Sequence, residues 1–345
     1  MLMERAVLLF LMAVLAVPLR AAAPADTLCR DSASAGPVAR LWRTVNRVLD
    51  LRDSHRRQRA DTAYIVRTPG RLRLKLAVNG YGSDLDTRWG RGGSEYRSRL
   101  KAQNKYTMSL TASYRGLSLS VAANPAKLAG RNKDYELNLN AYGNRLGADL
   151  ILQSAKTYEG TVDGPTGSVE APVGSVSQDM IMANAYYVFN GRRFSFPAAF
   201  TQSWVQRRSA GSFMLGVSFV GGRIKTDFAD VLGSGAARLR VLCGSVGAGY
   251  AYNWVVKGRW LLHISTLPQF VVVSRNRMET AGGEEKMPYR FPNMVVAGRL
   301  AAVRHFDRYF AGMNAVVNTS FLGDYDAFAV STLKWRARVF VGIKF

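Results

Sequence analysis

Cysteine and histidine are both scarce in this sequence. Its 345 residues include two cysteines, Cys29 and Cys243, whose wide separation does not indicate a disulfide framework. With only three histidines, the chain has no cluster of His, Cys and carboxylate residues at metal-ligand spacing, and no glycine-rich phosphate loop opens a helix. We therefore expect no metal or other cofactor. Cys243 lies in an apolar, strand-like run, which predicts a small buried side chain.

Acidic residues are also few. There are 24 Asp and Glu against 47 Lys and Arg, a formal charge of +23. Such a balance usually indicates nucleic acid, an anionic membrane surface or an acidic ligand as the partner. The amino terminus argues against nucleic acid, because Arg5, an apolar run over residues 6–17 and the small residues 21–23 are typical of a secretory leader. We expect residues 1–23 to be a cleaved signal peptide.

Long apolar runs are missing as well. The apolar part of the leader is too short to span a bilayer as a helix, and no later stretch approaches the length of about 18 residues that this requires. The three residues before Cys29 do not match a lipoprotein cleavage site. The mature protein is therefore expected to have neither a transmembrane helix nor a lipid anchor.

The last thirteen residues alternate strictly between two kinds of side chain. Leu333, Trp335, Ala337, Val339, Val341, Ile343 and Phe345 form an apolar set, and the intervening set is mostly Lys and Arg. Side chains alternate across a strand, so this segment has one apolar and one basic face. A soluble sandwich strand could show the same alternation. The leader, the length and the carboxyl-terminal Phe345 favour an antiparallel, up-and-down transmembrane β-barrel of the outer membrane over residues 61–345.

The same two-residue period recurs from Leu72 onward. Thirteen strands are counted, including segments at 180–189, 192–205, 212–224, 239–255, 260–273, 294–304 and 309–320. Short turns alternate with long polar connections at 83–104, 125–134, 158–178, 274–293 and 321–327, which matches short periplasmic turns and longer outer loops. A barrel with both ends in the periplasm needs an even number, so one assignment must be wrong. Residues 192–238 are the suspect region, and twelve strands are favoured over fourteen.

Three local signals qualify these strands. Asn190-Gly191 predicts a two-residue hairpin turn. Pro197 and Pro268 lie in strand-like runs, and because proline cannot donate to a ladder, each is expected to mark a bulge or a strand end.

Residues 24–60 form a periplasmic segment with one helical pattern. Apolar residues recur at helical spacing from Val38 to Leu49, and the opposite face is rich in arginine. Such a basic amphipathic helix would either cap or pack against the periplasmic mouth of the barrel, or lie on anionic head groups. It is also the basis for a possible periplasmic tether.

The central part of the chain resembles a known family. Tyr186–Phe200 (YYVFNGRRFSFPAAF), Gln206–Ser212 (QRRSAGS) and Asp61–Ile65 (DTAYI) are similar to the uncharacterised barrels called domain of unknown function 4421. The resemblance covers roughly residues 61–345 and implies an outer-membrane barrel of diderm bacteria, without any activity or catalytic residue. From the residues themselves, 207–212 would form a structural corner between two strands or fold inward as a constriction.

Two groups of residues are candidates for a site. His263 and Ser265 share one face of a strand, and Asn253 on the preceding strand could approach them, as in the His-x-Ser pair of outer-membrane phospholipases. The alternative is a polar pair that faces the lumen. The second group is a basic lumen wall, formed by Arg71, Arg73 and Lys75 on the first strand and Lys334, Arg336, Arg338 and Lys344 on the last.

The sequence thus favours a non-enzymatic barrel, either a small pore or a structural or surface protein, with an anion-attracting lumen. The alternatives are an acyl hydrolase that uses Ser265 and His263, and a tether through the basic helix. The expected partners are outer-membrane lipid and lipopolysaccharide, the barrel-assembly machinery through the strand that ends in Phe345, and small anions. No nucleic acid is expected.

Overall fold

The computed structural model describes residues 60–345, except for 69–71, 92–93, 115–116, 124–134, 166, 227–236, 257–258, 281–282, 288 and 325–327. The chain divides into two units, residues 1–60 and 61–345. The predicted leader, Cys29 and the predicted helix over 38–60 lie outside the described residues, apart from Ala60. The described part of the second unit is all-β apart from one short helix.

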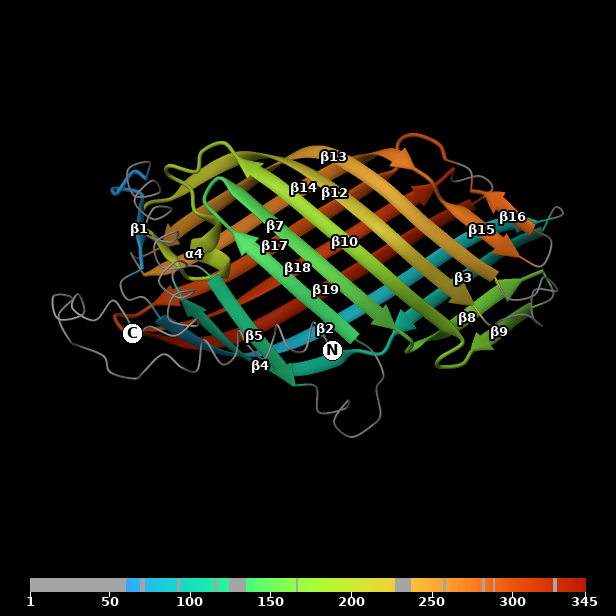
Figure 1. Cartoon of the computed structure of the whole chain (residues 1–345), viewed down its shortest axis with the longest axis horizontal. Helices are drawn as coiled ribbons and strands as arrows, with labels where there is room; N and C mark the ends of the chain where they lie inside the picture. The colour runs from blue at the N-terminus through green and yellow to red at the C-terminus, as the bar shows by residue number, and fades with distance from the viewer. Residues whose placement is uncertain are drawn as a thin grey trace, which may run out of the picture. The chain divides into compact units, whose positions relative to one another are not determined.

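The long strands form one antiparallel sheet (Figure 1), and most of them match the predicted segments closely. Successive ladders join β6 (Tyr135–Tyr142), β7 (Leu146–Ala155), β10 (Val176–Val188), β12 (Ala210–Thr226), β13 (Ala237–Val256), β14 (Trp260–Ser274), β17 (Met294–His305), β18 (Tyr309–Gly323), β19 (Phe328–Lys344), β2 (Leu72–Arg91), β4 (Lys105–Tyr114) and β5 (Leu117–Ala123). The last strand therefore lies beside the first long strand, with Lys344 opposite Arg73 and Phe328 opposite Trp89.

The two ends of the sheet differ. The connections from β6 to β7, from β10 to β12, from β13 to β14 and from β17 to β18 lie at one end, which we call the turn end. The opposite end, the loop end, carries most of the long connections. These are more ordered than the sequence predicted, because β2 continues to Arg91 and the loops contain β3 (Ser94–Ala102), β8 (Tyr158–Gly164), β9 (Gly167–Ala171), β15 (Arg277–Thr280) and β16 (Gly283–Lys286). These short strands pair mainly with one another and with the ends of the long strands (Figure 1).

The predicted strand over 192–205 is wrong. Residues 196–200 form the short helix α4 (Phe196–Phe200), with Ser195 as its N-cap and Pro197 in its first turn, where a missing backbone N–H costs nothing. Residues 204–206 form β11 (Trp204–Gln206), which pairs with β1 (Ile65–Arg67) outside the main sheet. The predicted Asn190-Gly191 hairpin is wrong too, because the chain leaves the sheet after β10 and returns only at β12. Pro268 does not mark a strand end, because it lies within β14 opposite Val296. The β13–β14 ladder has no pair at Pro268, and its register shift falls elsewhere, between Gly244 and Ser245.

The two faces of the sheet carry opposite kinds of side chain. One face exposes large apolar residues, among them Leu76, Val78, Leu110, Leu262, Ile264, Leu300, Met313, Val339 and Val341. The other face, which we call the inner face, buries polar residues such as Lys75, Asn79, Asn253 and Arg299. Cys243 is a free, buried thiol, as predicted. None of the described residues forms a helix long and apolar enough to cross a membrane.

Candidate functional site

The predicted basic wall lies on the inner face of β2 and β19. Arg73 and Lys75 are buried, and Arg336 and Arg338 are half-buried. The ladder places Arg338 opposite Asn79, whose side-chain oxygen accepts a hydrogen bond from the guanidinium. The structure therefore brings these cations to one wall, while Arg71 lies outside the described residues. The two strands contribute carboxylates only near the loop end, at Asp84 and Asp86.

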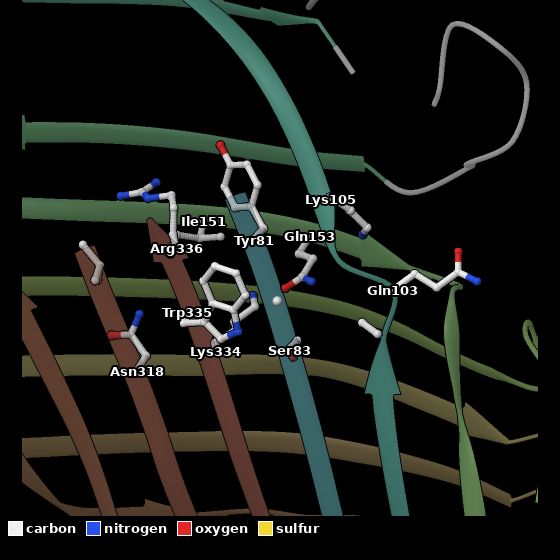
Figure 2. Close-up of a pocket in the computed structure, with 13 residues that line it drawn as sticks. Tyr81, Ser83, Gln103, Lys105, Ile151, Gln153, Asn318, Lys334, Trp335 and Arg336 are labelled. Atoms are coloured by element: carbon white, nitrogen blue, oxygen red, sulfur yellow. The ribbon is translucent and has the colours of Figure 1, made fainter. Parts of the chain in front are cut away.

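A cavity of about 60 Å³ opens beside this wall (Figure 2). Its cationic lining residues are Lys105, Lys334 and Arg336, and its polar lining includes Ser83 and Gln153. None of its lining residues, all within the described part of the chain, is Asp or Glu. The Gln153 Oε1 and Arg336 Nε atoms are buried and have no hydrogen-bond partner among the described residues. The cavity is large enough for a few water molecules or one small anion.

Below this cavity, at the turn end, residues 189–209 fold onto the inner face. We call them the inward segment. Its core is apolar, since Phe194, Phe196, Ala198 and Ala199 are fully buried and Phe200 is nearly so. The alternative of a corner or an inward fold concerned residues 207–212. Arg207 and Arg208 are exposed and lead from β11 into β12, so these residues form the corner, whereas the residues before them, which were predicted to be a strand, fold inward.

The inward segment contacts side chains from strands that are far apart in the sequence. The ring of Phe196 lies 5.1 Å from that of Tyr186 on β10 and 4.9 Å from that of His263 on β14, between centroids. The Lys75 ammonium on β2 donates to the Phe200 carbonyl and to Gln202 Oε1, each at 3.5 Å. These contacts hold the segment against several strands at once.

A second layer of backbone fixes the inward segment from the other side. β1 pairs with β11. Thr68 then donates its amide to the Ser203 carbonyl at 3.2 Å and its hydroxyl to the Gln202 carbonyl at 2.7 Å. The DTAYI and QRRSAGS motifs therefore meet in space, where Arg207 donates its amide to the Tyr64 carbonyl at 2.7 Å.

The candidate residues His263, Ser265 and Asn253 do come together. His263 Nδ1 lies 2.7 Å from Asn253 Oδ1, and His263 Nε2 lies 3.1 Å from Ser265 Oγ. The order hydroxyl, imidazole, amide is that of a nucleophile, a general base and the group that orients the base. The geometry requirement for such a triad is therefore met.

The surroundings of these three residues are those of a packed interior. Asn253, His263 and Ser265 are 0%, 3% and 4% exposed, and they lie on the inner face rather than on the apolar outer face. The rings of Phe194, Phe196 and Phe200 surround His263, with centroids 4.9–6.0 Å from the imidazole. The Ser265 hydroxyl is therefore enclosed by packed side chains in this structure.

Asn253 also anchors the inward segment. Its Nδ2 donates to the Ser195 carbonyl and to Gln206 Oε1, both at 3.0 Å. Gln206 in turn accepts from the Ser195 amide and donates to the carbonyls of Arg193 and Arg208. A continuous chain of hydrogen bonds thus runs from the inward segment through Asn253 and His263 to Ser265.

An ion pair that the sequence analysis missed lies beside this chain. Arg299 on β17 bonds Asp149 on β7 at 2.8 Å, and both side chains are less than 8% exposed. The Arg299 guanidinium also lies 5.4 Å from the Tyr186 ring and 5.6 Å from the Phe196 ring, a cation–π geometry. The signal available in the sequence was Arg299 itself, which shares its face of β17 with the small apolar residues Ala297 and Ala301. The sequence does not show which residue pairs with it.

Comparisons with known proteins give a family but no activity. No curated protein matches the sequence. The outer-membrane protease OmpT of Escherichia coli is a similar structure, with a TM-score of 0.43 and 7% identity over 81% of this chain and 98% of that one. OprG of Pseudomonas aeruginosa has a TM-score of 0.28 and 8% identity over 81% and 97% of the two chains. The toluene transporter TodX of P. putida has a TM-score of 0.26 and 9% identity over 80% and 91%. These scores are too low to transfer any function. Residues 59–345, however, match the family described as Domain of unknown function (DUF4421), and the chain belongs to it.

Proposed function

We propose that this protein is an outer-membrane β-barrel of twelve strands. The ladders run from β6 around to β5, and pairing of β5 with β6 would close these twelve strands into a ring. A closed ring leaves no unpaired edge, as a bilayer requires. The exposed apolar residues on the outer face support contact with lipid, and the polar inner face supports a lumen.

We further propose that the barrel is non-enzymatic and that its lumen attracts anions. The observation that carries this proposal is the cavity beside the basic wall, which has three cations and no carboxylate in its lining. Arginine and lysine that line a pore favour anions over cations. The inward segment lies below the cavity and would close the periplasmic end, so the resting protein is a plugged barrel and not an open pore.

Ion conduction tests both parts of this proposal. In planar bilayers the parent should conduct little. Replacing residues 190–208 by a two-residue turn should open a pore that passes Cl⁻ in preference to K⁺. In that background, Lys334→Glu with Arg336→Glu should reverse the preference. The matched control, Arg88→Gln with Arg275→Gln at exposed loop-end positions, should not. A cation-selective pore before charge reversal would refute the anion-attracting lumen.

The triad geometry favours one second candidate, an acyl hydrolase. Ser265 Oγ would attack an ester carbonyl, His263 would accept its proton, and Asn253 would hold the imidazole in place. This activity requires the inward segment to leave, because the three phenylalanines cover the site. We regard the three residues as an anchor and expect no phospholipid hydrolysis, with or without Ca²⁺. Hydrolysis that Ser265→Ala abolishes would establish the hydrolase instead.

Two partners remain proposals. A strand with an apolar outer face that ends on Phe345 is suited to recognition by the barrel-assembly machinery, and the exposed apolar band is suited to outer-membrane lipid. The tether through residues 38–60 rests on the sequence alone.

A further inference from the structure

The turn end of the sheet is strongly basic. Seven arginines are exposed there, namely Arg192, Arg193, Arg207, Arg208, Arg259, Arg304 and Arg308. Among the described residues of this end, the opposing charges are Asp61, Asp307 and the terminal carboxylate of Phe345. Asp61 is already paired with Arg193 at 3.1 Å. A large excess of positive charge is therefore left facing solvent at this end.

The loop end is built differently. Its arginines alternate with carboxylates and pair with them, as in Arg97–Asp86 at 2.7 Å, Arg238–Glu279 at 3.3 Å and Arg277–Glu284 at 3.4 Å. Ion pairs between the described residues are thus frequent at the loop end, whereas Arg193 is the one of the seven turn-end arginines that forms an ion pair with another described residue. The asymmetry is a property of the folded protein that the overall charge of +23 does not reveal.

Exposed aromatic residues lie next to the turn-end arginines. Phe213, Tyr250, Trp254, Trp260, Phe306 and Tyr309 are all 38–70% exposed near the ends of β12, β13, β14 and β18. Aromatic residues gather where a membrane-spanning barrel meets the head groups. The Arg304 guanidinium lies 5.5 Å from the Trp260 ring and 5.0 Å from the Phe306 ring, so these rings hold it at that level.

Hydrogen bonds bring three of the arginines into one cluster. The His305 amide donates to the Arg259 carbonyl at 3.1 Å, which joins the turn before β14 to the end of β17. The Lys344 amide donates to the Arg308 carbonyl at 2.8 Å, which adds the end of β19. Arg259, Arg304, Arg308 and Lys344 therefore lie at the adjacent ends of β14, β17, β18 and β19, and Asp307 is the one acidic residue in the turn between β17 and β18.

We propose that this cluster binds the head group of an anionic phospholipid from the leaflet that contacts the turn end. The inference rests on the proposed membrane-spanning barrel. Guanidinium groups match a phosphate in geometry and charge, and the adjacent aromatic rings and apolar band supply a surface for the acyl chains. Binding of a soluble acidic polymer would not explain why the arginines lie beside exposed Trp and Tyr side chains. A phospholipid would contact both kinds of residue, so it is the favoured ligand.

Native mass spectrometry of the folded full-length chain provides the test. The protein is equilibrated with equal amounts of phosphatidylglycerol and phosphatidylcholine, and the lipids that remain bound are counted. The parent should retain phosphatidylglycerol preferentially. In the variant Arg259→Gln/Arg304→Gln/Arg308→Gln, the ratio of bound phosphatidylglycerol to bound phosphatidylcholine should fall at least fivefold. Each basic residue near an anionic surface raises the affinity for that surface about fivefold. If the triple variant does not fold, Arg259→Gln alone, at an exposed turn position, should lower this ratio about threefold to fivefold.

The matched control removes three exposed arginines at the loop end, through Arg88→Gln/Arg223→Gln/Arg275→Gln, and should keep the parental preference. Equal retention of the two lipids by the parent would overturn the proposal, and so would an equal loss in the control variant. Insertion into phosphatidylcholine vesicles, measured separately, tests the barrel itself. A protein that inserts normally without lipid preference contradicts only the head-group site.

Discussion

Replacing Asn253 by alanine should release the inward segment. Asn253 is completely buried, and its amide holds three partners, the Ser195 carbonyl, Gln206 Oε1 and His263 Nδ1. Alanine would leave the Ser195 carbonyl and the imidazole nitrogen buried without a partner. Gln206 Oε1 would still accept from the Ser195 amide at 3.0 Å.

The size of the effect follows from these two unpaired groups. A buried polar group that loses its partner costs about 1–3 kcal/mol, so Asn253→Ala should lower the free energy of opening the segment by about 3 kcal/mol. A change of about 1.4 kcal/mol is tenfold in an equilibrium. Amide hydrogen exchange of residues 194–206 should therefore become about 100-fold faster, while the amides of β12 and β13 remain protected.

Ser265→Ala is the matched control. Ser265 Oγ bonds His263 Nε2 but contacts no residue of the inward segment in the hydrogen bonds described above. Its removal should change exchange in the segment by less than about tenfold, because the anchor through Asn253 remains. Parental exchange rates in a folded Asn253→Ala variant would refute the view that this chain of hydrogen bonds holds the segment in place.

Three further predictions follow from the faces of the sheet and its interior. Val341→Arg places a charge on the lipid face and should cost about 2–4 kcal/mol of folding free energy in lipid vesicles, whereas insertion equal to the parent would mean that the two faces are wrongly assigned. Arg299→Met leaves Asp149 buried without its partner and should destabilise the barrel by about 3–5 kcal/mol in a denaturant titration, and an unchanged midpoint would contradict a buried ion pair. Deleting Phe345 should sharply reduce the amount of protein that reaches the outer membrane, and normal assembly would show that the terminal residue is not recognised.

Most of the strands could be predicted from the sequence because alternation is a local property. In Leu333–Phe345 the polarity of each side chain indicates the face of the strand on which it lies. The structure exposes Leu333, Val339 and Val341, as the pattern predicts. The sequence also predicted that the first and last long strands are neighbours, because closing a sheet joins its two ends. The structure confirms this pairing with the β19–β2 ladder. These inferences need no knowledge of distant contacts.

The inward segment could not be predicted from alternation. Residues 192–205 alternate well enough to resemble a strand, but the Phe196 ring packs against His263 and Tyr186 in the interior. Lys75 also donates a hydrogen bond to the Phe200 carbonyl. The proline that begins α4 and the capping Ser195 were the local signals for a helix. The error lies within residues 192–238, the region that was suspected because a false strand breaks the alternation of short turns and long loops.

The candidate site was predictable only in part. The spacing of His263 and Ser265 predicts a shared face, and Asn253 was placed on the correct neighbouring strand. Whether that face meets lipid or the interior depends on register across the sheet. Arg299 and Asp149 are 150 residues apart, so their pairing is a property of the tertiary fold alone.

A membrane-spanning barrel with an apolar outer face and a basic lumen requires lipid accessibility to alternate along β19. With Cys29 and Cys243 replaced by serine, spin labels are attached at successive positions through Arg336→Cys, Ala337→Cys, Arg338→Cys, Val339→Cys, Phe340→Cys and Val341→Cys in lipid vesicles. We expect high accessibility to oxygen dissolved in the bilayer at 337, 339 and 341, and low accessibility at 336, 338 and 340. Equal accessibility at all six positions, or the opposite alternation, would contradict such a barrel.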